Sequence, residues 1–151
     1  MALSANAFYE IQPRPVTATE ARRVTNGAQV YLNALIGVDA TTGLAEPFDG
    51  AAGTQFLGLA THERLGDTST YSDGDSRGQV VVDVSGPAIT VPVTGAAGAG
   101  DQQAEVWASD DGTFTLTDPT GPKSIGYVKK YITGTTCRVQ LLSAQEWFAH
   151  A

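Results

Sequence analysis

The chain has little of what most catalytic and metal sites are made from. Its 151 residues include one cysteine and two histidines. A single cysteine excludes an internal disulfide and a cysteine-based zinc cluster, and His62 and His150 are too few for a histidine cluster or a histidine-based triad. Cys137 lies in an alternating segment, which favours a small buried strand residue over a reactive thiol. We therefore expect no enzyme, no metal site and no cofactor.

Long apolar runs and basic charge are also scarce. No stretch approaches 18 consecutive apolar residues, and the N-terminus lacks a basic start followed by an apolar run, so we expect a soluble protein without a signal peptide. Nine Lys and Arg stand against sixteen Asp and Glu, for a net charge of −7. This charge repels nucleic acid phosphates and anionic membrane surfaces alike. We expect neither nucleic acid nor membrane as a partner.

Glycine and proline, by contrast, occur throughout. Seventeen glycines and seven prolines interrupt the chain at short intervals, which suits short strands joined by turns better than long helices. Segments such as "QVVVDV" and "TCRVQLL" alternate apolar with polar residues, as half-buried strands do. The sequence therefore predicts an all-β fold: a small β-barrel or β-tulip, or a sandwich.

The first segment of the chain differs from the rest. Residues 1–26 show no sustained periodicity, and Pro13 and Pro15 favour extended backbone around them. Thr17 and Glu20 have the spacing of a capping box, which allows a turn or two of helix at most. We expect an extended N-terminal arm here.

The strand candidates occupy residues 27–142, which we expect to form the β-barrel domain. Residues 143–151 follow as a C-terminal tail or a short helix, because Ser143 and Glu146 again have capping-box spacing. Residues 62–78 are rich in Gly, Ser, Thr and Asp, and indicate an exposed loop between two strands. Three aspartates in this loop lack the spacing of an EF-hand, so a solvated loop is favoured over a calcium site.

The two halves of the chain show a similar order of elements. Each has a strand, a turn containing glycine, a short strand, an apolar pair around a glycine, and an alternating strand. The matched sets are Ala28–Tyr31 with Ala104–Trp107, Gly43 with Gly112, Phe56–Leu59 with Ser124–Tyr127, and Val80, Val82 and Val84 with Cys137, Val139 and Leu141. A duplicated β unit is favoured over two meanders that are alike only because strands alternate.

Gly58 and Gly126 take the same place in these two units. A glycine inside a strand marks a bulge, a bend or a close backbone approach. We expect Gly58 and Gly126 to be paired bends that let two small sheets curl around one core, with the loop at 62–78 inserted in one half only.

The second half resembles a known family. The run "GDQQAEVWASDDGTFTLTDPTGPKSIGYVKKYITGTTCRVQLL", residues 100–142, resembles the capsid cement, or head decoration, proteins of tailed bacteriophages. A G-D turn, a V-Y/W strand, a D-G turn, a threonine-rich strand, an I/V-G strand and a final alternating strand follow in that order. "QFLGLA" and "GQVVVDVSGPAITVPV" in the first half are similar to the family's preceding segment, so the resemblance covers residues 27–142. The loop "RLGDTSTYSDGDSRG" and the aromatic C-terminal tail depart from the family's commonest pattern.

The resemblance implies a structural virion protein. Members bind the outer surface of the expanded capsid, contact the major capsid protein, stabilise the shell, and often form homotrimers. The chain would then be assembled in the host cytoplasm and be located on the outside of the virion. On this view the candidate partner contacts are the apolar, aromatic and basic residues of the arm and tail: Phe8, Tyr9, Ile11, Arg14, Trp147 and Phe148.

Two other functions fit the composition. One is a different phage structural β module, such as a tail-tube or head-fibre component. The other is a carbohydrate-binding β-sandwich, because two Trp and five Tyr supply aromatic rings, although they form no obvious platform in the sequence.

Overall fold

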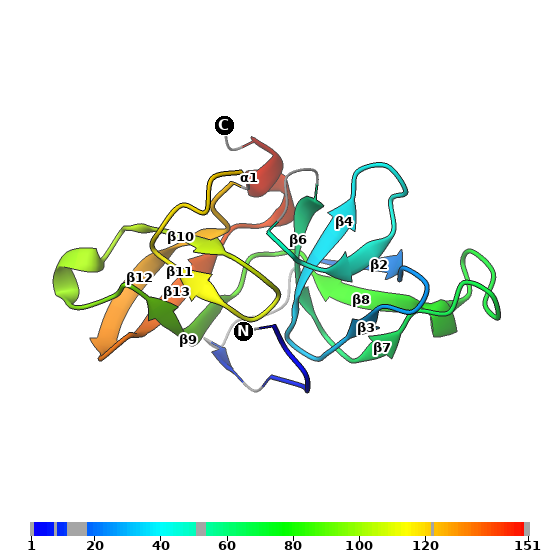
Figure 1. Cartoon of the computed structure of the whole chain (residues 1–151), viewed down its shortest axis with the longest axis horizontal. Coiled ribbons are helices and arrows are strands. Elements are labelled where there is room, and N and C mark those ends of the chain that lie inside the picture. Colours follow the sequence, from blue (N-terminus) through cyan, green and yellow to red (C-terminus); the bar gives the residue numbers. More distant parts are fainter. Residues whose placement is uncertain (1, 8, 12–17, 51–53, 122, 150–151) are drawn as a thin grey trace.

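A computed structural model gives the fold of the chain and describes residues 2–7, 9–11, 18–50, 54–121 and 123–149. The fold is all-β with one short C-terminal helix, as the sequence predicts. The strands form two groups that lie side by side, with β6 (Thr54–Ala60) between them (Figure 1). We call the group from the second half the closed barrel and the group from the first half the open barrel.

The closed barrel has five strands. They follow one another around the barrel in the order β9-β11-β10-β12-β13, and β13 pairs with β9 to close the ring. All neighbours are antiparallel except β11 and β9, which are parallel. The strands are β9 (Ala88–Thr94), β10 (Glu105–Ala108), β11 (Phe114–Thr115), β12 (Gly126–Thr133) and β13 (Thr136–Leu141).

The open barrel uses five strands in the corresponding order, β2-β8-β6-β4-β5. Its two outer strands meet only at one parallel bridge between Val24 and Ala45. The strands other than β6 are β2 (Thr19–Arg23), β4 (Leu35–Asp39), β5 (Ala45–Pro47) and β8 (Gln79–Asp83). A small ribbon of β3 (Gln29–Val30) and β7 (Arg64–Leu65) lies beside them.

The two barrels share their register as well as their strand order. Gly58 pairs with Ile36 in the open barrel, and Gly126 pairs with Val106 in the closed barrel. The parallel bridge at Val24 corresponds to the parallel pair of Val93 with Phe114. Strands β2, β4, β5, β6 and β8 therefore correspond to β9, β10, β11, β12 and β13, and the chain is built from two related β units.

One part of the expected alignment is wrong. The match of Ala28–Tyr31 with Ala104–Trp107 fails because the run from Ala28 to Val38 is two strands, β3 and β4, and Asn33 between them has a φ of 63°. Asparagine tolerates this left-handed conformation better than most residues. The counterpart of Ala104–Trp107 is residues 34–37, which lead into and begin β4.

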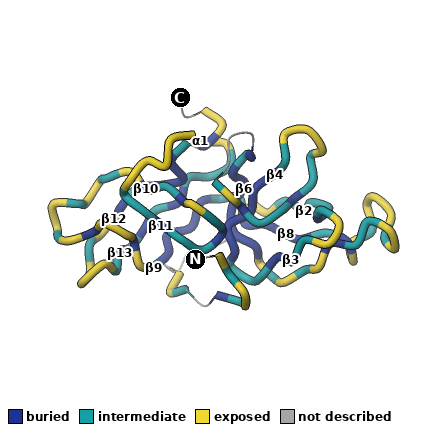
Figure 2. The backbone as a smooth tube through the Cα atoms, in the orientation of Figure 1, coloured by how far each residue is buried: buried dark blue, intermediate teal, exposed yellow. Residues whose placement is uncertain are grey.

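The core is also divided differently from the expectation of a single core. The buried apolar residues form two clusters, one in each barrel. Strand β6 contributes to both, because Phe56 and Leu59 pack in the closed-barrel cluster while Leu57 and Ala60 pack in the open-barrel cluster. The dark-blue buried strands therefore run through the middle of the molecule, whereas exposed loops lie at both ends (Figure 2).

The N-terminal segment is part of the barrels. The expected turn of helix near Glu20 is wrong, because residues 19–23 form β2 and pair with β8 along its length. Strand β1 (Glu10–Ile11) pairs with β9. Thr17, which would have capped the helical turn, is outside the described residues. The described part of the expected arm is extended, but it is integrated into two sheets rather than separate from them.

The C-terminal helix α1 (Ala144–Ala149) begins with the predicted capping box. The Glu146 amide donates to Ser143 Oγ at 3.1 Å, and the Ser143 amide donates to Glu146 Oε1 at 3.0 Å. The Ala144 amide donates to the Val84 carbonyl, so the helix is attached to the open barrel as well. Among the described residues, no helix combines the length and apolar character that crossing a membrane requires.

The connection from β6 to β8 is the long insertion expected in one half only. It contains β7 and the short 3-10 helix η1 (Ser76–Gly78), whereas β12 and β13 are joined by a short turn. The Arg23 guanidinium donates to the carbonyls of Thr68 and Tyr71, and Asp67 Oδ1 accepts from the amides of Ser69 and Thr70. The loop thus extends from the open-barrel end as an ordered projection (Figure 1). A second short 3-10 helix, η2 (Ala99–Asp101), lies between β9 and β10.

Candidate functional site

The side chains with reactive groups have structural partners. His62 lies beside β8, where its Nε2 accepts from the Val81 amide at 3.0 Å. Cys137 is buried in the closed-barrel cluster, and burial raises the pKa of its thiol. A neutral, buried thiol is a poor nucleophile. His62 therefore supports the backbone of β8, and Cys137 fills space in the core.

The carboxylates of the turns also hold local structure. Asp39 Oδ1 accepts from the amides of Thr41 and Thr42, and these bonds keep the pKa of Asp39 low. Hydrogen bonds from Thr70 and Ser69 likewise lower the pKa of Asp67. Within the described ranges, His, Cys, Asp and Glu side chains nowhere gather in threes around a possible metal position.

The candidate contact residues of the N-terminal segment have different surroundings. Phe8 and Arg14 lie outside the described residues. Tyr9 packs against the closed-barrel cluster, with its ring edge-on to Phe114 at 6.3 Å. Ile11 is 42% exposed although its backbone pairs with Ile89. Ile11 therefore has an exposed side chain that a partner can reach, whereas Tyr9 packs mainly against the core of its own chain.

Hydrogen bonds fasten this segment to both barrels. The Ala7 amide donates to the Leu32 carbonyl at 3.0 Å, and the Leu32 amide donates to Asn6 Oδ1 at 2.8 Å. The Asn33 side chain donates to the Ala7 carbonyl at 2.9 Å. At the closed barrel, the Leu3 amide donates to Asp111 Oδ1 at 2.9 Å. The segment therefore bridges the two units.

Asp111 is the residue that the sequence analysis missed. In sequence it resembles any turn aspartate, yet only 3% of it is exposed and its backbone carbonyl also accepts from the Leu35 amide. Burial raises the pKa of its carboxyl group, the hydrogen bond from Leu3 opposes this, and the charge of Asp110 adds to the rise. Asp111 thus connects the N-terminal segment, β4 and the closed barrel. Its partners are distant in sequence, so no local pattern reveals them.

The two aromatic residues of α1 point in different directions. Trp147 is 6% exposed and belongs to the closed-barrel cluster, and the Lys123 ammonium lies over its ring at 4.6 Å from the centroid. Its indole N–H is buried without a hydrogen-bond partner. Trp147 therefore packs on the protein itself and offers little to a partner.

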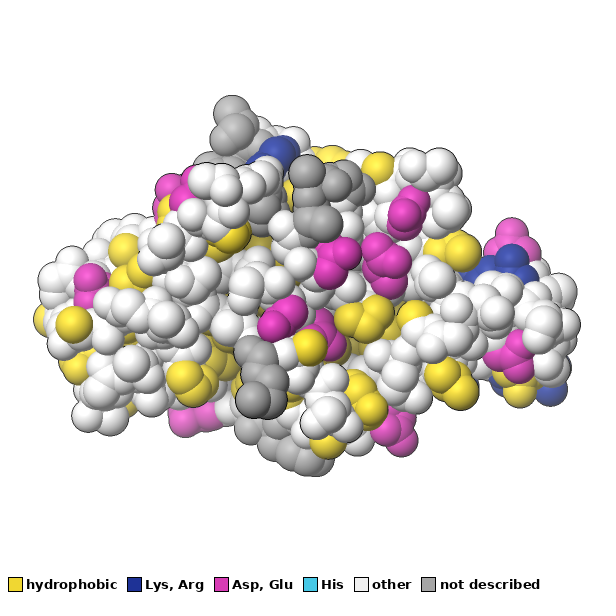
Figure 3. All heavy atoms as spheres, viewed as in Figure 1, with side chains coloured by type: hydrophobic (Ala, Val, Ile, Leu, Met, Phe, Trp, Pro, Cys, Tyr) yellow, Lys and Arg dark blue, Asp and Glu magenta, His cyan; other side chains and the backbone are white. Residues whose placement is uncertain are grey.

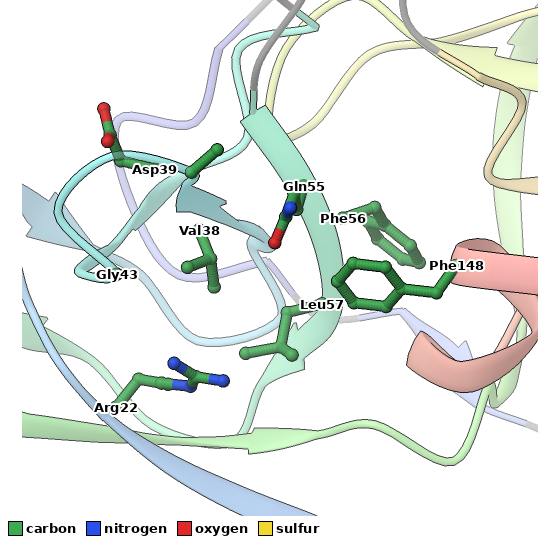
Figure 4. A pocket seen from close by; sticks show the side chains of 9 residues that line it. Arg22, Val38, Asp39, Gly43, Gln55, Phe56, Leu57 and Phe148 are labelled. Carbon is green, nitrogen blue, oxygen red and sulfur yellow. The ribbon is translucent and has the colours of Figure 1, made fainter.

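Phe148 is 53% exposed and lies edge-on to Trp147 at 5.5 Å. It reaches from α1 toward Leu57 of β6 and forms one side of a pocket of about 130 Å³, with Arg22 on another side (Figure 4). A half-exposed aromatic ring beside a shallow hollow suits a protein contact better than a small-molecule site. Of the residues expected from the tail, Phe148 is the one accessible to a partner.

Acidic side chains gather over the middle of one face (Figure 3). Three carboxylates of the open barrel also interact with one another: partial burial raises the pKa of Glu46, and the charges of Asp49 and Asp39 add to the rise. Repulsion between neighbouring carboxylates favours a basic partner surface beside them.

Gly58 and Gly126 each lie where the backbone of an adjacent strand comes too close for a side chain. A Cβ atom on Gly58 would collide with the carbonyl oxygen of Asp83, and a Cβ atom on Gly126 would collide with that of Gln140. Gly58 adjoins a register shift in the pairing of β4 with β6, whereas Gly126 lies in regular pairing with Leu141. Both glycines thus allow close backbone approach, and the structure places a bulge next to Gly58 alone.

Comparison with protein-family models and with curated proteins finds no match to this chain.

Proposed function

We propose that the chain is a capsid decoration protein that binds the outer surface of a tailed-phage head through the major capsid protein and stabilises contacts between capsid subunits. The observation that supports the proposal most is the tandem β-barrel. The resemblance to decoration proteins covers residues 27–142, and strands of both barrels fall within this range. A rigid β scaffold with accessible contact residues suits a stabilising role, which requires no catalytic group.

Two exposed apolar residues supply the contacts in this proposal. Ile11 on β1 and Phe148 on α1 belong to elements on opposite sides of the molecule in the view of Figure 1. Opposite contacts suit a protein that touches two neighbouring capsid subunits at once. Because many copies bind one shell and each holds two subunits, each contact can be modest.

Binding to expanded empty heads tests the proposal. Purified protein is expected to sediment with the heads and to raise their melting temperature in calorimetry. Phe148→Ser is expected to weaken binding about tenfold, which corresponds to about 1.4 kcal/mol. Leu65→Ser is the matched control, because Leu65 on β7 is similarly exposed, at 56%, and is not among the proposed contacts.

The two variants distinguish a specific contact from nonspecific hydrophobic adsorption to the heads. Equal binding of wild type and Leu65→Ser, with weaker binding of Phe148→Ser, supports a contact through α1. Absence of wild-type binding at saturating concentration would refute the decoration function itself.

A further inference from the structure

The internal duplication reveals an uncovered strand edge. In the closed barrel, β1 covers the outer edge of β9 by pairing opposite Ile89 and Thr90. The corresponding positions on β2 are Glu20 and Ala21, because both strands keep the same register with their inner neighbours, β13 and β8. Within the described ranges, β2 ends its sheet, and Val24 just beyond it makes the one pairing on that side.

The backbone of β2 is oriented to accept another strand. The Val84 amide donates to the Ala18 carbonyl and the Val24 amide donates to the Gly78 carbonyl, so even-numbered residues direct their backbone groups toward β8. The N–H and C=O groups of Thr19 and Ala21 and the N–H of Arg23 therefore face outward, whereas the C=O of Arg23 lies in the parallel bridge with Ala45.

An open groove of about 450 Å³ adjoins this edge. Its lining comes from β2, the turn between β4 and β5, the long loop before β8 and the start of β8: Ala21, Arg22, Arg23, Thr42, Asp73 and Gln79 are among these residues. The groove leaves space beside β2 at the place where the open barrel fails to close.

The side chains of β2 also differ from those of β9 at the barrel-facing positions. Where β9 has Ile89 and Val91, both fully or almost fully buried, β2 has Glu20 and Arg22. These two form an ion pair with each other, and more than a third of each side chain is exposed. The edge of the open barrel thus carries a negative charge on one side of Ala21, at Glu20, and a positive charge on the other side, at Arg22.

We propose that β2 pairs with β2 of a second copy of this chain, antiparallel and centred on Ala21. In this register Glu20 of each copy lies opposite Arg22 of the other, at the separation where cross-strand charge pairs attract. The outward amide and carbonyl of Ala21 then face those of Ala21 in the other copy, and the amide of Arg23 faces the carbonyl of Thr19. A shift by two residues in either direction places Glu20 opposite Glu20 or Arg22 opposite Arg22, so the charges select one register.

Charged residues on edge strands usually prevent association, because a second copy brings the same charge. The order of Glu20, Ala21 and Arg22 reverses this effect, since a two-fold axis through Ala21 brings opposite charges together. The resulting interface is isologous and closes after two copies. It is independent of the proposed capsid function, and it differs from the homotrimer that the family resemblance implies.

Charge exchange between copies tests the pairing directly. Sedimentation equilibrium is expected to show a monomer–dimer equilibrium for the wild type. Glu20→Arg and Arg22→Glu are each expected to weaken dimerisation at least tenfold, because each places like charges opposite one another. An equimolar mixture of the two variants is expected to form the heterodimer, in which both cross-strand pairs are attractive again. Glu63→Arg, at an exposed position outside β2, carries the same charge change as Glu20→Arg and is expected to dimerise like the wild type.

Ala21→Pro tests the backbone contact. The amide of Ala21 faces outward, so proline spares the pairing with β8 and removes a donor to the second copy. This variant is expected to be monomeric with a wild-type circular dichroism spectrum. A monomeric or trimeric wild type, a dimer that survives Glu20→Arg, or a mixture that fails to associate while each variant is folded would overturn the proposal.

Discussion

Gly58 and Gly126 are the residues at which the duplicated fold is most sensitive to substitution. In each case the atom that a new Cβ would meet is a backbone carbonyl oxygen of the adjacent strand, which a side-chain rotation cannot relieve. Gly58→Ala and Gly126→Ala are therefore each expected to lower the free energy of unfolding by about 1–3 kcal/mol, the cost of overpacking a tight site. Urea denaturation measures this difference.

Gly98→Ala is the matched control for this prediction. A Cβ on Gly98 meets no atom within 4 Å, and the backbone of Gly98 is extended. This variant should therefore unfold at a urea concentration close to that of the wild type. Wild-type stability of Gly58→Ala or Gly126→Ala would mean that the adjacent strand moves away easily.

Tyr9 gives the stability of the protein a dependence on alkaline pH. Burial first, and then the charges of Asp111 and Asp110, raises the pKa of Tyr9 from 10.0 to about 12. The folded chain therefore holds this proton more tightly than the unfolded chain, so the contribution to stability is present below pH 10 and is lost as the pH rises to about 12.

Tyr9→Phe removes this titration. Between pH 10 and 12 the free energy of unfolding is expected to fall less steeply for Tyr9→Phe than for the wild type, whereas from pH 7 to 9 the two curves should run parallel. Urea titrations at each pH measure both slopes. Equal slopes above pH 10 would show that the hydroxyl reaches solvent in the folded state.

At the scale of elements, the N-terminal segment stabilises the fold by covering what the barrels leave open. Leu3 packs against the open-barrel cluster and Tyr9 against the closed-barrel cluster, while β1 covers the edge of β9. Deleting residues 2–11 exposes these surfaces and removes the hydrogen bond to Asp111.

The deletion is expected to lower the melting temperature by several degrees, since each loss of about 1 kcal/mol shifts the melting temperature of a domain of this size by about 2–4 °C. Asn6→Ala, which removes only the acceptor for the Leu32 amide, should have a smaller effect in the same direction. A deletion variant that melts like the wild type would mean that the segment contributes no net stability.

Patterns that depend on neighbours in sequence were predictable from the sequence. The capping box of Ser143 and Glu146 forms as expected, and the match of Gly58 with Gly126 holds because both satisfy the same strand-to-strand approach. Strand β2 was not predictable, because "TEARR" is charged and becomes a strand through its pairing with β8. The misplaced boundary between β3 and β4 has a similar origin, since one left-handed Asn33 divides an otherwise continuous apolar run.

The candidate contacts were predictable in kind but not residue by residue. Trp147 and Phe148 are adjacent on a helix, where successive side chains point about 100° apart. The sequence therefore indicates that they face different directions, but which of them enters the core depends on how α1 packs against β6. Asp111 shows the same limit, because its burial comes from residues on the N-terminal segment and β4.

At the scale of the whole molecule, the duplication has produced two barrels that are not independent. Leu35, Phe48, Phe56 and Leu59 come from the first half of the chain but belong to the closed-barrel cluster. Strand β6 has buried residues on both faces, as strands enclosed between two layers do. Helix α1 and the N-terminal segment add further contacts across the junction.

This shared core predicts that the chain unfolds as one unit. Calorimetry of the full chain is expected to show a single transition with equal calorimetric and van't Hoff enthalpies, the test of two-state behaviour. A fragment of residues 86–151 contains every strand of the closed barrel but lacks the four apolar residues that the first half supplies. It is expected to melt without a cooperative transition and to bind a hydrophobic dye. Two separate transitions, or a cooperatively folded fragment, would show instead that each barrel folds independently of the other.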